Sequence, residues 1–394
     1  MQKEINVLII ASGWFRGTDD VNDGKFDLFS QRFQNCIALR TDRKDCRYVK
    51  TSTHLTRGFY QPSWVRRTRI LSRLQFFTAA VLEFGLFGRR KWRADIVVAR
   101  DPLSSGLTSL VISRLLGIPF IVELNGNFAN DAIWQRPDGR TAVLRRRIAW
   151  RVKKFVIQRA AAVKQIYPTQ LAELSIPRVS ARLFTFHNYV APSDVQKHEK
   201  QEGDYLISMG FPWYIKGYDI LINAYNLVLK ENPNYPYSLR IVGWIRDHEK
   251  EELASRCDFS DPRIHLLSPV PYEEGQQLIA DAAAFVLASR TDAMARVLIE
   301  AMRAGTLCIS SRVDGIPHYI RDHETGLLFD SGDERQLADQ IASLTDNDYT
   351  ALIENAQQRA QEDYSVASFT RHYEEMLTAV LEDAAANNVQ ARVS

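Results

Sequence analysis

Short apolar runs alternate along the chain with longer stretches in which apolar residues recur at helical spacing. Such runs are typical of buried parallel strands, and the longer stretches are typical of helices that cover a sheet. The runs predict strands at Ile5–Ile10, Arg47–Ser52, Ile96–Ala99, Phe120–Leu124, Ala162–Ile166, Leu183–Phe186, Tyr205–Met209, Ser238–Val242, Ile264–Leu267 and Ala284–Leu287. The pattern therefore predicts an α/β protein with doubly wound parallel sheets.

A polar segment at 195–204 separates two repeats of this pattern. The 394 residues also exceed what one ordinary core accommodates. We therefore predict an N-terminal domain at 1–194, a linker at 195–204, a C-terminal domain at 205–364 and a C-terminal helix and tail at 365–394. The last helix is expected to run from Val366 to about Glu382, followed by a frayed tail.

Charge is divided unevenly between the two halves. Residues 1–195 hold 32 Lys and Arg against 15 Asp and Glu, whereas the remainder holds 18 against 32. An excess of positive charge attracts an anionic partner, such as a membrane surface, a lipid phosphate or nucleic acid. Charge alone does not separate these partners.

Cysteine content and hydropathy indicate the cellular compartment of the protein. The four cysteines are too few and too scattered for a disulfide framework, and no two have a metal-binding spacing, which fits a reducing cytoplasm. The apolar run Ile5–Ala11 suits a buried first strand better than a signal peptide. We predict that no apolar stretch is as long as the roughly 18 residues that a transmembrane helix needs. We therefore expect no membrane span.

The segment Ser289–Gly305 places one carboxylate after a strand and a second eight residues later in a helix. The helix could offer its N-terminus to a diphosphate, and Glu300 could accept hydrogen bonds from hydroxyls. The plain alternative is that Asp292 is a solvent-exposed helix cap and Glu300 an ordinary helical residue.

This segment resembles the donor signature of glycosyltransferase family 4, in which an acidic residue, seven others and a Glu precede Ala-Met and a Gly. Further matching positions in the same order are Gly210, Lys216-Gly217, Ile241-Val242-Gly243, Ile309-Ser310-Ser311, Asp314-Gly315-Ile316-Pro317 and His323–Phe329. The resemblance covers nearly all of residues 204–340. It implies the GT-B fold: two Rossmann-like domains that face each other across a cleft, with a C-terminal helix that crosses back to the N-terminal domain.

The resemblance also implies roles for individual residues. Glu300 corresponds to the ligand of the nucleotide ribose, Asp292 to the residue that contacts the donor sugar, and Lys216 to the ligand of the diphosphate. A carboxylate suits paired hydroxyls, and a lysine supplies a point charge for phosphate. The other expected donor-binding residues are Gly210, Val270, Ala293, Met294, Ala295 and Arg296.

Several positions depart from the family pattern. Asp292 is one methylene shorter than the usual Glu, and Phe211-Pro212-Trp213 stands where an Arg usually follows the glycine. Arg296 either substitutes for that guanidinium or has a surface role. Ala293 and Ala295 stand where glycines are common, which leaves the backbone less freedom.

In the N-terminal half the resemblance is thinner. Asn125 takes the place of the family's catalytic-loop histidine, with Gly126 after it, and Ser12-Gly13 takes the place of the acceptor loop after the first strand. We expect Asn125 to act together with Asp292 in catalysis, and Ser12, Gly13 and Gly126 to face the acceptor. An amide can orient a hydroxyl or donate to a phosphate oxygen but cannot act as a base. The plain alternative for Asn125-Gly126 is a turn.

Two basic stretches carry interleaved aromatic residues. We expect membrane contact through Arg66, Arg67, Arg69, Arg145, Arg146 and Arg147. Basic residues among aromatics on a helix suit an anionic bilayer interface. The alternative is an amphipathic helix that faces the core and exposes a solvated basic face. We therefore expect a cytoplasmic protein that is peripheral on the inner face of the cell membrane.

The resemblance thus implies a retaining, metal-independent glycosyltransferase of class EC 2.4. It would move a sugar from a UDP- or GDP-sugar to a lipid-linked or other saccharide in cell-surface polysaccharide or lipopolysaccharide biosynthesis, without a cofactor. Two alternatives remain open: an epimerase of nucleotide sugars, and a nucleotide-sugar-binding protein without turnover. We expect no nucleic-acid partner, because no recognised module accompanies the basic charge.

Overall fold

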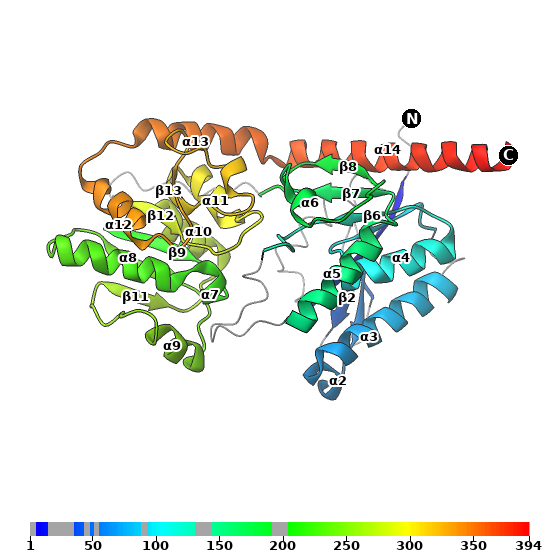
Figure 1. Ribbon diagram of the computed structural model, residues 1–394, viewed down its shortest axis with the longest axis horizontal. Helices are drawn as coiled ribbons and strands as arrows, with labels where there is room; N and C mark the ends of the chain where they lie inside the picture. Colours follow the sequence, from blue (N-terminus) through cyan, green and yellow to red (C-terminus); the bar gives the residue numbers. More distant parts are fainter. Residues whose placement is uncertain are drawn as a thin grey trace. The chain divides into compact units, whose positions relative to one another are not determined.

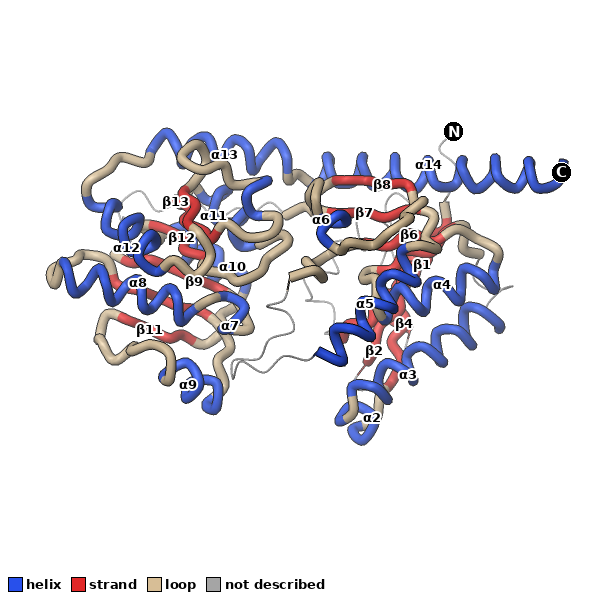
Figure 2. The backbone as a smooth tube through the Cα atoms, in the orientation of Figure 1, coloured by secondary structure: helices blue, strands red, loops and turns tan. Residues whose placement is uncertain are grey.

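The short apolar runs of the sequence form two parallel sheets, each covered by helices (Figures 1 and 2). The computed structural model describes residues 5–14, 35–42, 48–50, 55–87, 93–130, 143–190 and 204–393. The chain forms two compact units. Unit 1 consists of Met1–Asn125, Val143–Phe186 and Thr370–Ser394, and unit 2 consists of Gly126–Ala142 and His187–Phe369.

The unit boundaries differ from the predicted domain boundaries. The chain passes from unit 1 to unit 2 after Phe186 rather than at 195–204, and the segment Gly126–Ala142 also groups with unit 2. Apart from Asp204, the predicted linker lies outside the described residues.

Unit 1 contains an eight-stranded sheet in the order β3-β4-β2-β1-β5-β6-β7-β8. Its strands are β1 (Asn6–Trp14), β2 (Asn35–Asp42), β3 (Tyr48–Lys50), β4 (Leu55–Tyr60), β5 (Ile96–Ala99), β6 (Phe120–Glu123), β7 (Ala162–Gln165) and β8 (Arg182–Thr185). All neighbours pair in parallel except β3, which runs antiparallel to β4. Strands β5, β6 and β7 are buried along their whole length. Strands that are buried on both faces of a sheet appear in the sequence as apolar runs, and the sequence pattern predicted these strands for that reason.

One helical segment of unit 1 is a candidate membrane span, which the sequence analysis did not predict. The helices are α2 (Ser63–Arg67), α3 (Arg69–Ala80), the π-helix η1 (Val81–Phe87), α4 (Ser104–Leu116), α5 (Val143–Ile157) and α6 (Gln170–Glu173). Among the described residues, Ile70–Phe87 is long and apolar enough to cross a membrane by length and composition, with a mean hydropathy of 1.4 and 22% of it buried. The expectation that no stretch reaches this length was therefore wrong. Core helices meet the same criterion, so this finding does not assign a span.

Unit 2 contains a six-stranded parallel sheet in the order β11-β10-β9-β12-β13-β14. Its strands are β9 (Tyr205–Met209), β10 (Ser238–Val242), β11 (Ile264–Leu267), β12 (Ala284–Leu287), β13 (Leu307–Ser311) and β14 (Leu327–Phe329). Counted from the start of the unit, the order is 3-2-1-4-5-6, which is the order of the Rossmann fold. The predicted doubly wound α/β architecture is confirmed.

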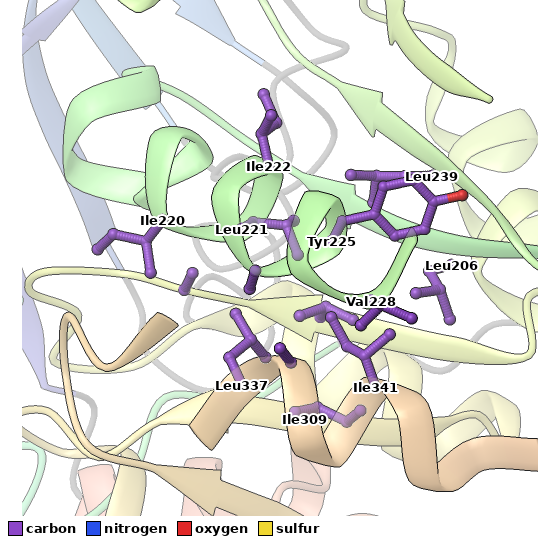
Figure 3. Packing of buried hydrophobic residues seen from close by; sticks show 14 of the residues in the cluster. Leu206, Ile220, Leu221, Ile222, Tyr225, Val228, Leu239, Ile309, Leu337 and Ile341 are labelled. Atoms are coloured by element: carbon purple, nitrogen blue, oxygen red, sulfur yellow. The ribbon is translucent and has the colours of Figure 1, made fainter. Parts of the chain in front are cut away.

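Helices cover both faces of this second sheet and enclose two apolar cores. The helices of unit 2 are α7 (Trp213–Lys216), α8 (Tyr218–Glu231), α9 (Asp247–Ala254), α10 (Tyr272–Ala280), α11 (Arg296–Ala304), η4 (Ile316–His318), α12 (Glu334–Ala342), η5 (Ser343–Thr345) and α13 (Thr350–Asp363). Figure 3 shows one core, in which Leu221, Tyr225 and Val228 of α8 lie against Leu337 and Ile341 of α12. Helices α10 and α11 pack in the other core, which holds the β12–β13 region in place.

The last helix, α14, runs from Val366 to Val393, so the expected frayed tail is helical as far as Val393. The helix begins in unit 2, and from Thr370 onward it belongs to unit 1. Within unit 1, Tyr373 donates a hydrogen bond to Glu123 at the end of β6 (2.8 Å), and Arg182 of β8 pairs with Asp383 (3.0 Å). The C-terminal helix therefore returns to the unit that begins the chain, as the resemblance implied.

Candidate functional site

The strand order of unit 2 by itself indicates where a ligand would bind. From β9 the chain continues to β10 on one side, whereas from β12 it continues to β13 on the other side. The loops after two such adjacent strands diverge, and ligands of open α/β sheets bind in the crevice that this divergence leaves at the carboxyl ends. Two loops meet there, 210–217 after β9 and 288–295 after β12.

Two glycines shape this region, and one of them, Gly217, allows the two loops to lie close together. Gly210 has a φ of 131°, and a Cβ on it would lie 2.9 Å from the Cε of Lys216. Gly217 has a φ of 65°, and a Cβ on it would lie 1.9 Å from the carbonyl oxygen of Ala288. Both φ values favour glycine because other residues rarely adopt such angles, and at Gly217 a side chain would also collide with the backbone of Ala288. The stem of Lys216 therefore lies across Gly210, at the carboxyl end of β9.

Lys216 and Asp292 form an ion pair that joins the two loops. The Nζ of Lys216 lies 2.7 Å from Oδ2 of Asp292, and each side chain is about 15% exposed. The sequence assigned phosphate to Lys216 and sugar hydroxyls to Asp292, and the structure brings the two residues into contact. A lysine has three donors, so Lys216 can hold Asp292 and still reach an anion.

Arg290 fixes the position of the β12 loop relative to the start of α8. Its two terminal nitrogens each lie 2.8 Å from an oxygen of Asp219, and one of them also donates to the carbonyl of Tyr214 (2.8 Å). The guanidinium also lies over the Tyr214 ring, 4.3 Å from its centroid. A bidentate pair of this kind restricts geometry, so it holds the loops that carry Lys216 and Asp292.

Glu300 lies one turn into α11 and is only 8% exposed. Its carboxylate accepts hydrogen bonds from Nε2 of Gln276 (2.9 Å) and from the hydroxyl of Tyr272 (3.4 Å). Burial raises the pKa of Glu300, and the Arg296 guanidinium and these hydrogen bonds oppose that rise. A buried carboxylate that costs folding free energy is a candidate for binding, because ordinary helical glutamates are exposed. This burial excludes the alternative in which Glu300 is an ordinary solvated residue.

The other predicted donor-binding residues surround this centre. Arg296 is the first residue of α11, and its charge acts on Glu300 and Tyr272. Ala293 and Ala295 are buried, and the backbone N–H of Ala295 donates to the Tyr319 hydroxyl (2.8 Å). Val270 and Met294 are partly buried and pack against the second core of the unit.

Asp314 belongs to one of the matching segments of the sequence, but sequence reasoning assigned it no role in the site. Its carboxylate accepts from Thr291 (2.5 Å), from Asn127 (2.7 Å) and from Asn130 (2.9 Å). Asn130 also donates to the carbonyl of Arg290 (3.2 Å). Asp314 thus connects the β12 loop to the segment that follows β6 in the chain and groups with unit 2. The sequence feature that could have identified Asp314 is an Asp before Gly, which is typical of a turn. Asp314 has a φ of 46°, and an Asp tolerates this left-handed conformation.

In unit 1, Asn125 follows β6 and its amide makes two contacts. The Nδ2 donates to Oε2 of Glu123 (2.8 Å) and to the carbonyl oxygen of Arg100 (3.0 Å). A Cβ added at Gly126 would meet nothing within 4 Å. The side-chain contacts of Asn125 exceed those of a plain turn.

Ser12 and Gly13 were predicted to lie at the end of the first strand, which was expected to stop at Ile10. Strand β1 continues to Trp14, with a shift in its pairing with β2 between Ile10 and Trp14. The two residues therefore lie in the irregular end of the strand, because the parallel partner continues beyond the apolar run. Their side chains are outside the described part of the structure.

The predicted membrane-contact residues lie on three helices of unit 1. Arg66 and Arg67 are in α2 and Arg69 begins α3, but their side chains are outside the described part of the structure. Arg145, Arg146 and Arg147 are exposed on α5. Large apolar side chains are exposed on the same helices and on η1: Trp64, Ile70, Leu71, Leu74, Leu82, Leu86, Phe87, Val143, Leu144, Ile148, Trp150 and Phe155.

The helix formed by α3 and η1 has two apolar faces. Phe76, Ala80 and Phe84 are buried in unit 1, whereas Ile70 is 76% exposed and Phe87 is 79% exposed. Exposed apolar side chains in such number mark an interaction surface. We call the exposed apolar and basic residues of α2, α3, η1 and α5 the amphipathic surface.

Within the described residues that were searched, no group of three or more His, Cys, Asp or Glu side chains forms a candidate metal site.

Residues 191–361 match the family model of glycosyl transferases group 1. A D-inositol 3-phosphate glycosyltransferase of Corynebacterium kroppenstedtii is 31% identical over 180 residues, which are 43% of this chain. The chain spans only 38% of the length of that relative.

Two solved structures share the fold over nearly the whole chain. The sucrose-phosphate synthase of Thermosynechococcus elongatus has a TM-score of 0.76 at 15% identity and covers 96% of this chain and 100% of that one. The Anabaena protein HepE in complex with UDP-glucose has a TM-score of 0.70 at 14% identity, with 95% and 100% covered. The fold is therefore GT-B, as the resemblance implied.

Proposed function

We propose that the protein is a glycosyltransferase of class EC 2.4 that binds a nucleotide-sugar donor at the β9 and β12 loops of unit 2. The observation that carries this proposal is the buried carboxylate of Glu300 beside a switch point where Lys216 and Asp292 meet. The family match over 191–361 covers the same loops, and HepE was solved with UDP-glucose.

Each residue of the site has a role in this proposal. Glu300 accepts hydrogen bonds from the ribose hydroxyls, and Gln276 orients the Glu300 carboxylate. Lys216 stabilises the diphosphate, whose negative charge grows as the sugar leaves. Asp292 holds Lys216 in place and accepts hydrogen bonds from the sugar. Because Asp292 already pairs with Lys216, its shorter side chain suits a bridging role better than a long reach into the site.

We include in the proposal the retaining, family 4 type of reaction. The acceptor hydroxyl attacks the anomeric carbon on the face from which the nucleoside diphosphate leaves, and its proton passes to the departing phosphate oxygen. The new glycosidic bond then has the configuration of the donor. Analysis of the product by NMR tests this, and an inverted anomeric configuration would contradict it.

Metal independence is also part of the proposal, because Lys216 and Arg296 can supply positive charge near the phosphates. Activity is therefore expected to be unchanged by EDTA. The measurement is the rate of nucleoside diphosphate release with and without chelator. A loss of rate that Mg²⁺ or Mn²⁺ restores would contradict this prediction.

Lys216→Gln is expected to weaken binding of a nucleoside diphosphate by about 10-fold, because a charge-assisted contact contributes about 1.5 kcal/mol. Binding of the same nucleoside without phosphates should be unchanged, since Lys216 would touch only the phosphates. Calorimetric titration with both ligands measures the difference. Lys230→Gln on α8 is the matched control, and equal weakening of both ligands by Lys216→Gln would contradict the phosphate role.

The amphipathic surface extends the proposal to the acceptor. Exposed arginines among exposed aromatic and aliphatic side chains on α5 suit an anionic lipid surface. We propose that unit 1 docks on the cytoplasmic face of the membrane and that the acceptor is a lipid-linked or other membrane-borne saccharide of cell-surface polysaccharide assembly. The names of two similar proteins support a second acceptor class, a small phosphorylated polyol or sugar.

Simple measurements separate the transferase from its alternatives. An epimerase would convert the nucleotide sugar without an acceptor and without releasing the nucleoside diphosphate. A binding protein would be stabilised by the nucleotide sugar without any turnover. A transferase releases the nucleoside diphosphate faster when the acceptor is added.

A further inference from the structure

A buried polar cluster lies at the carboxyl ends of β5, β6 and β7 in unit 1. At its centre is Glu123, whose side chain has no exposed surface. The Oε1 of Glu123 accepts a hydrogen bond from the Tyr373 hydroxyl (2.8 Å), and the Oε2 accepts one from Nδ2 of Asn125 (2.8 Å). Each carboxylate oxygen is therefore held by a different residue, one from the loop after β6 and one from α14.

Two cations accompany this carboxylate. The Nε of Arg100 lies 3.3 Å from Oε2 of Glu123, and Lys164 of β7 is fully buried beside it. Burial lowers the pKa of Lys164 to about 8, with Glu123 raising it and Arg100 lowering it further. Burying charged groups costs folding free energy that a structural contact rarely needs, since apolar residues fill such space equally well. The cluster is therefore a candidate for a functional role.

The cluster determines how Asn125 is oriented. Both hydrogens of its amide are donated, one to Glu123 and one to the carbonyl of Arg100. The opposite orientation would place Oδ1 against a carboxylate and a carbonyl oxygen, which repel it. Any contact of this side chain with a substrate is therefore made through Oδ1, which accepts hydrogen bonds.

We propose that Glu123 and Tyr373 are positioning residues that hold Asn125 so that its Oδ1 accepts a hydrogen bond from a substrate hydroxyl. The sequence left open whether Asn125 orients a hydroxyl or donates to a phosphate oxygen, and the geometry selects the hydroxyl. The C-terminal helix thereby helps to position Asn125, although Tyr373 lies 250 residues beyond Glu123. This inference rests on the proposed transferase function.

The test is a double-mutant cycle on the rate of sugar transfer. Tyr373→Phe removes one hydroxyl and keeps the ring, which is packed against Phe186. It is expected to lower kcat about 5-fold, the worth of one hydrogen bond, with the Kd of the donor unchanged. Combined with Asn125→Ala, it should lower kcat no further than Asn125→Ala alone, because the residue that it positions is absent.

Tyr225→Phe is the matched control. It removes a comparable buried hydroxyl, which donates to the carbonyl of Tyr237 (2.7 Å) in unit 2 and is no part of the cluster around Glu123. Its kcat should equal that of the wild type. Full additivity of Tyr373→Phe and Asn125→Ala would overturn the positioning role, and so would an equal loss of kcat in the control.

Asn125→Asp supplies an independent readout. The new carboxylate faces Glu123 and loses the donor, so activity should be low near neutral pH. As pH falls, protonation restores an O–H donor to Glu123, and activity relative to the wild type should rise. A pH-independent ratio would contradict the proposal.

Failure of this inference is distinguishable from failure of the proposed function. If no nucleotide sugar stabilises the wild-type protein against heat, the transferase proposal fails and this inference fails with it. If a donor binds and turns over but the cycle is additive, only the positioning role fails.

Discussion

Glu300→Gln is expected to weaken nucleotide-sugar binding by about 10- to 100-fold, because a hydrogen bond to a carboxylate contributes about 1.5–3 kcal/mol. The glutamine has nearly the same shape, so it tests the charge rather than the packing. Calorimetric titration of the donor measures the change. The same titration with a 2′,3′-dideoxynucleotide should show no difference between the variant and the wild type, because the hydroxyls that Glu300 would bind are absent.

The same substitution is expected to leave the unliganded protein no less stable at neutral pH. Burial raises the folded-state pKa of Glu300 above its ordinary value of 4.5. The folded state therefore binds this proton more tightly than the unfolded state, so the contribution of Glu300 to stability is present at low pH and is lost as pH rises through the raised pKa. At neutral pH its charged form is a cost, which the uncharged glutamine removes.

These two results together separate a binding role from a structural role. Chemical denaturation at pH 7 measures the free energy of unfolding of each protein. Weak donor binding with unchanged or higher stability supports the binding role. A large loss of stability with unchanged donor affinity would show instead that Glu300 serves the fold. Donor affinity of the wild type should also fall as pH is lowered toward the raised pKa, because the protonated carboxyl accepts hydroxyls poorly.

Leu144→Ser combined with Ile148→Ser is expected to reduce binding to anionic vesicles by about 100-fold. Both side chains are more than half exposed on α5, so their burial in a lipid interface would contribute about 3 kcal/mol or more together. Co-sedimentation with phosphatidylglycerol-containing vesicles measures this loss. The thermal midpoint and donor affinity should not change, because neither residue supports the core.

Leu183→Ser is the matched control for the membrane prediction, since Leu183 is an exposed leucine of β8 in the same unit. Neutralising Arg145, Arg146 and Arg147 should weaken binding to anionic vesicles but not to neutral ones, by about 1 kcal/mol for each arginine. Equal vesicle binding by the wild type and the Leu144 and Ile148 variant would contradict a lipid-facing role for α5. Another partner would then have to account for the amphipathic surface.

Buried parallel strands were the part of the fold that the sequence located best. The predicted bounds of β5, β9, β10, β11 and β12 are those observed. Apart from β11, which is an edge strand, these strands lie inside their sheets and read as largely apolar runs. Strands β2, β4, β13 and β14 were missed. In β2 and β4 the apolar residues are interrupted by Arg, Thr and Gly, so their strand character depends on pairing with sheet neighbours rather than on local pattern.

The residues of the candidate site also divide into those that the sequence predicted and those that it did not. The positions of Lys216, Asp292 and Glu300 follow from local motifs at the end of α7, on the β12 loop and in α11, which a sequence displays directly. Their partners do not, because each contact joins residues far apart in the chain. Gln276 lies 24 residues from Glu300, and Asn127 lies 187 residues from Asp314. Only the folded sheet and its covering helices bring such residues together.

The central claim is that unit 2 binds a nucleotide sugar and that the protein transfers the sugar. The most direct measurement is release of the nucleoside diphosphate by the wild-type protein from a panel of UDP-, GDP- and ADP-sugars, with Glu300→Gln beside it. We predict slow release from one donor, accompanied by thermal stabilisation, and both should be strongly reduced in the variant. Neither stabilisation nor release with any donor of the panel would contradict the account.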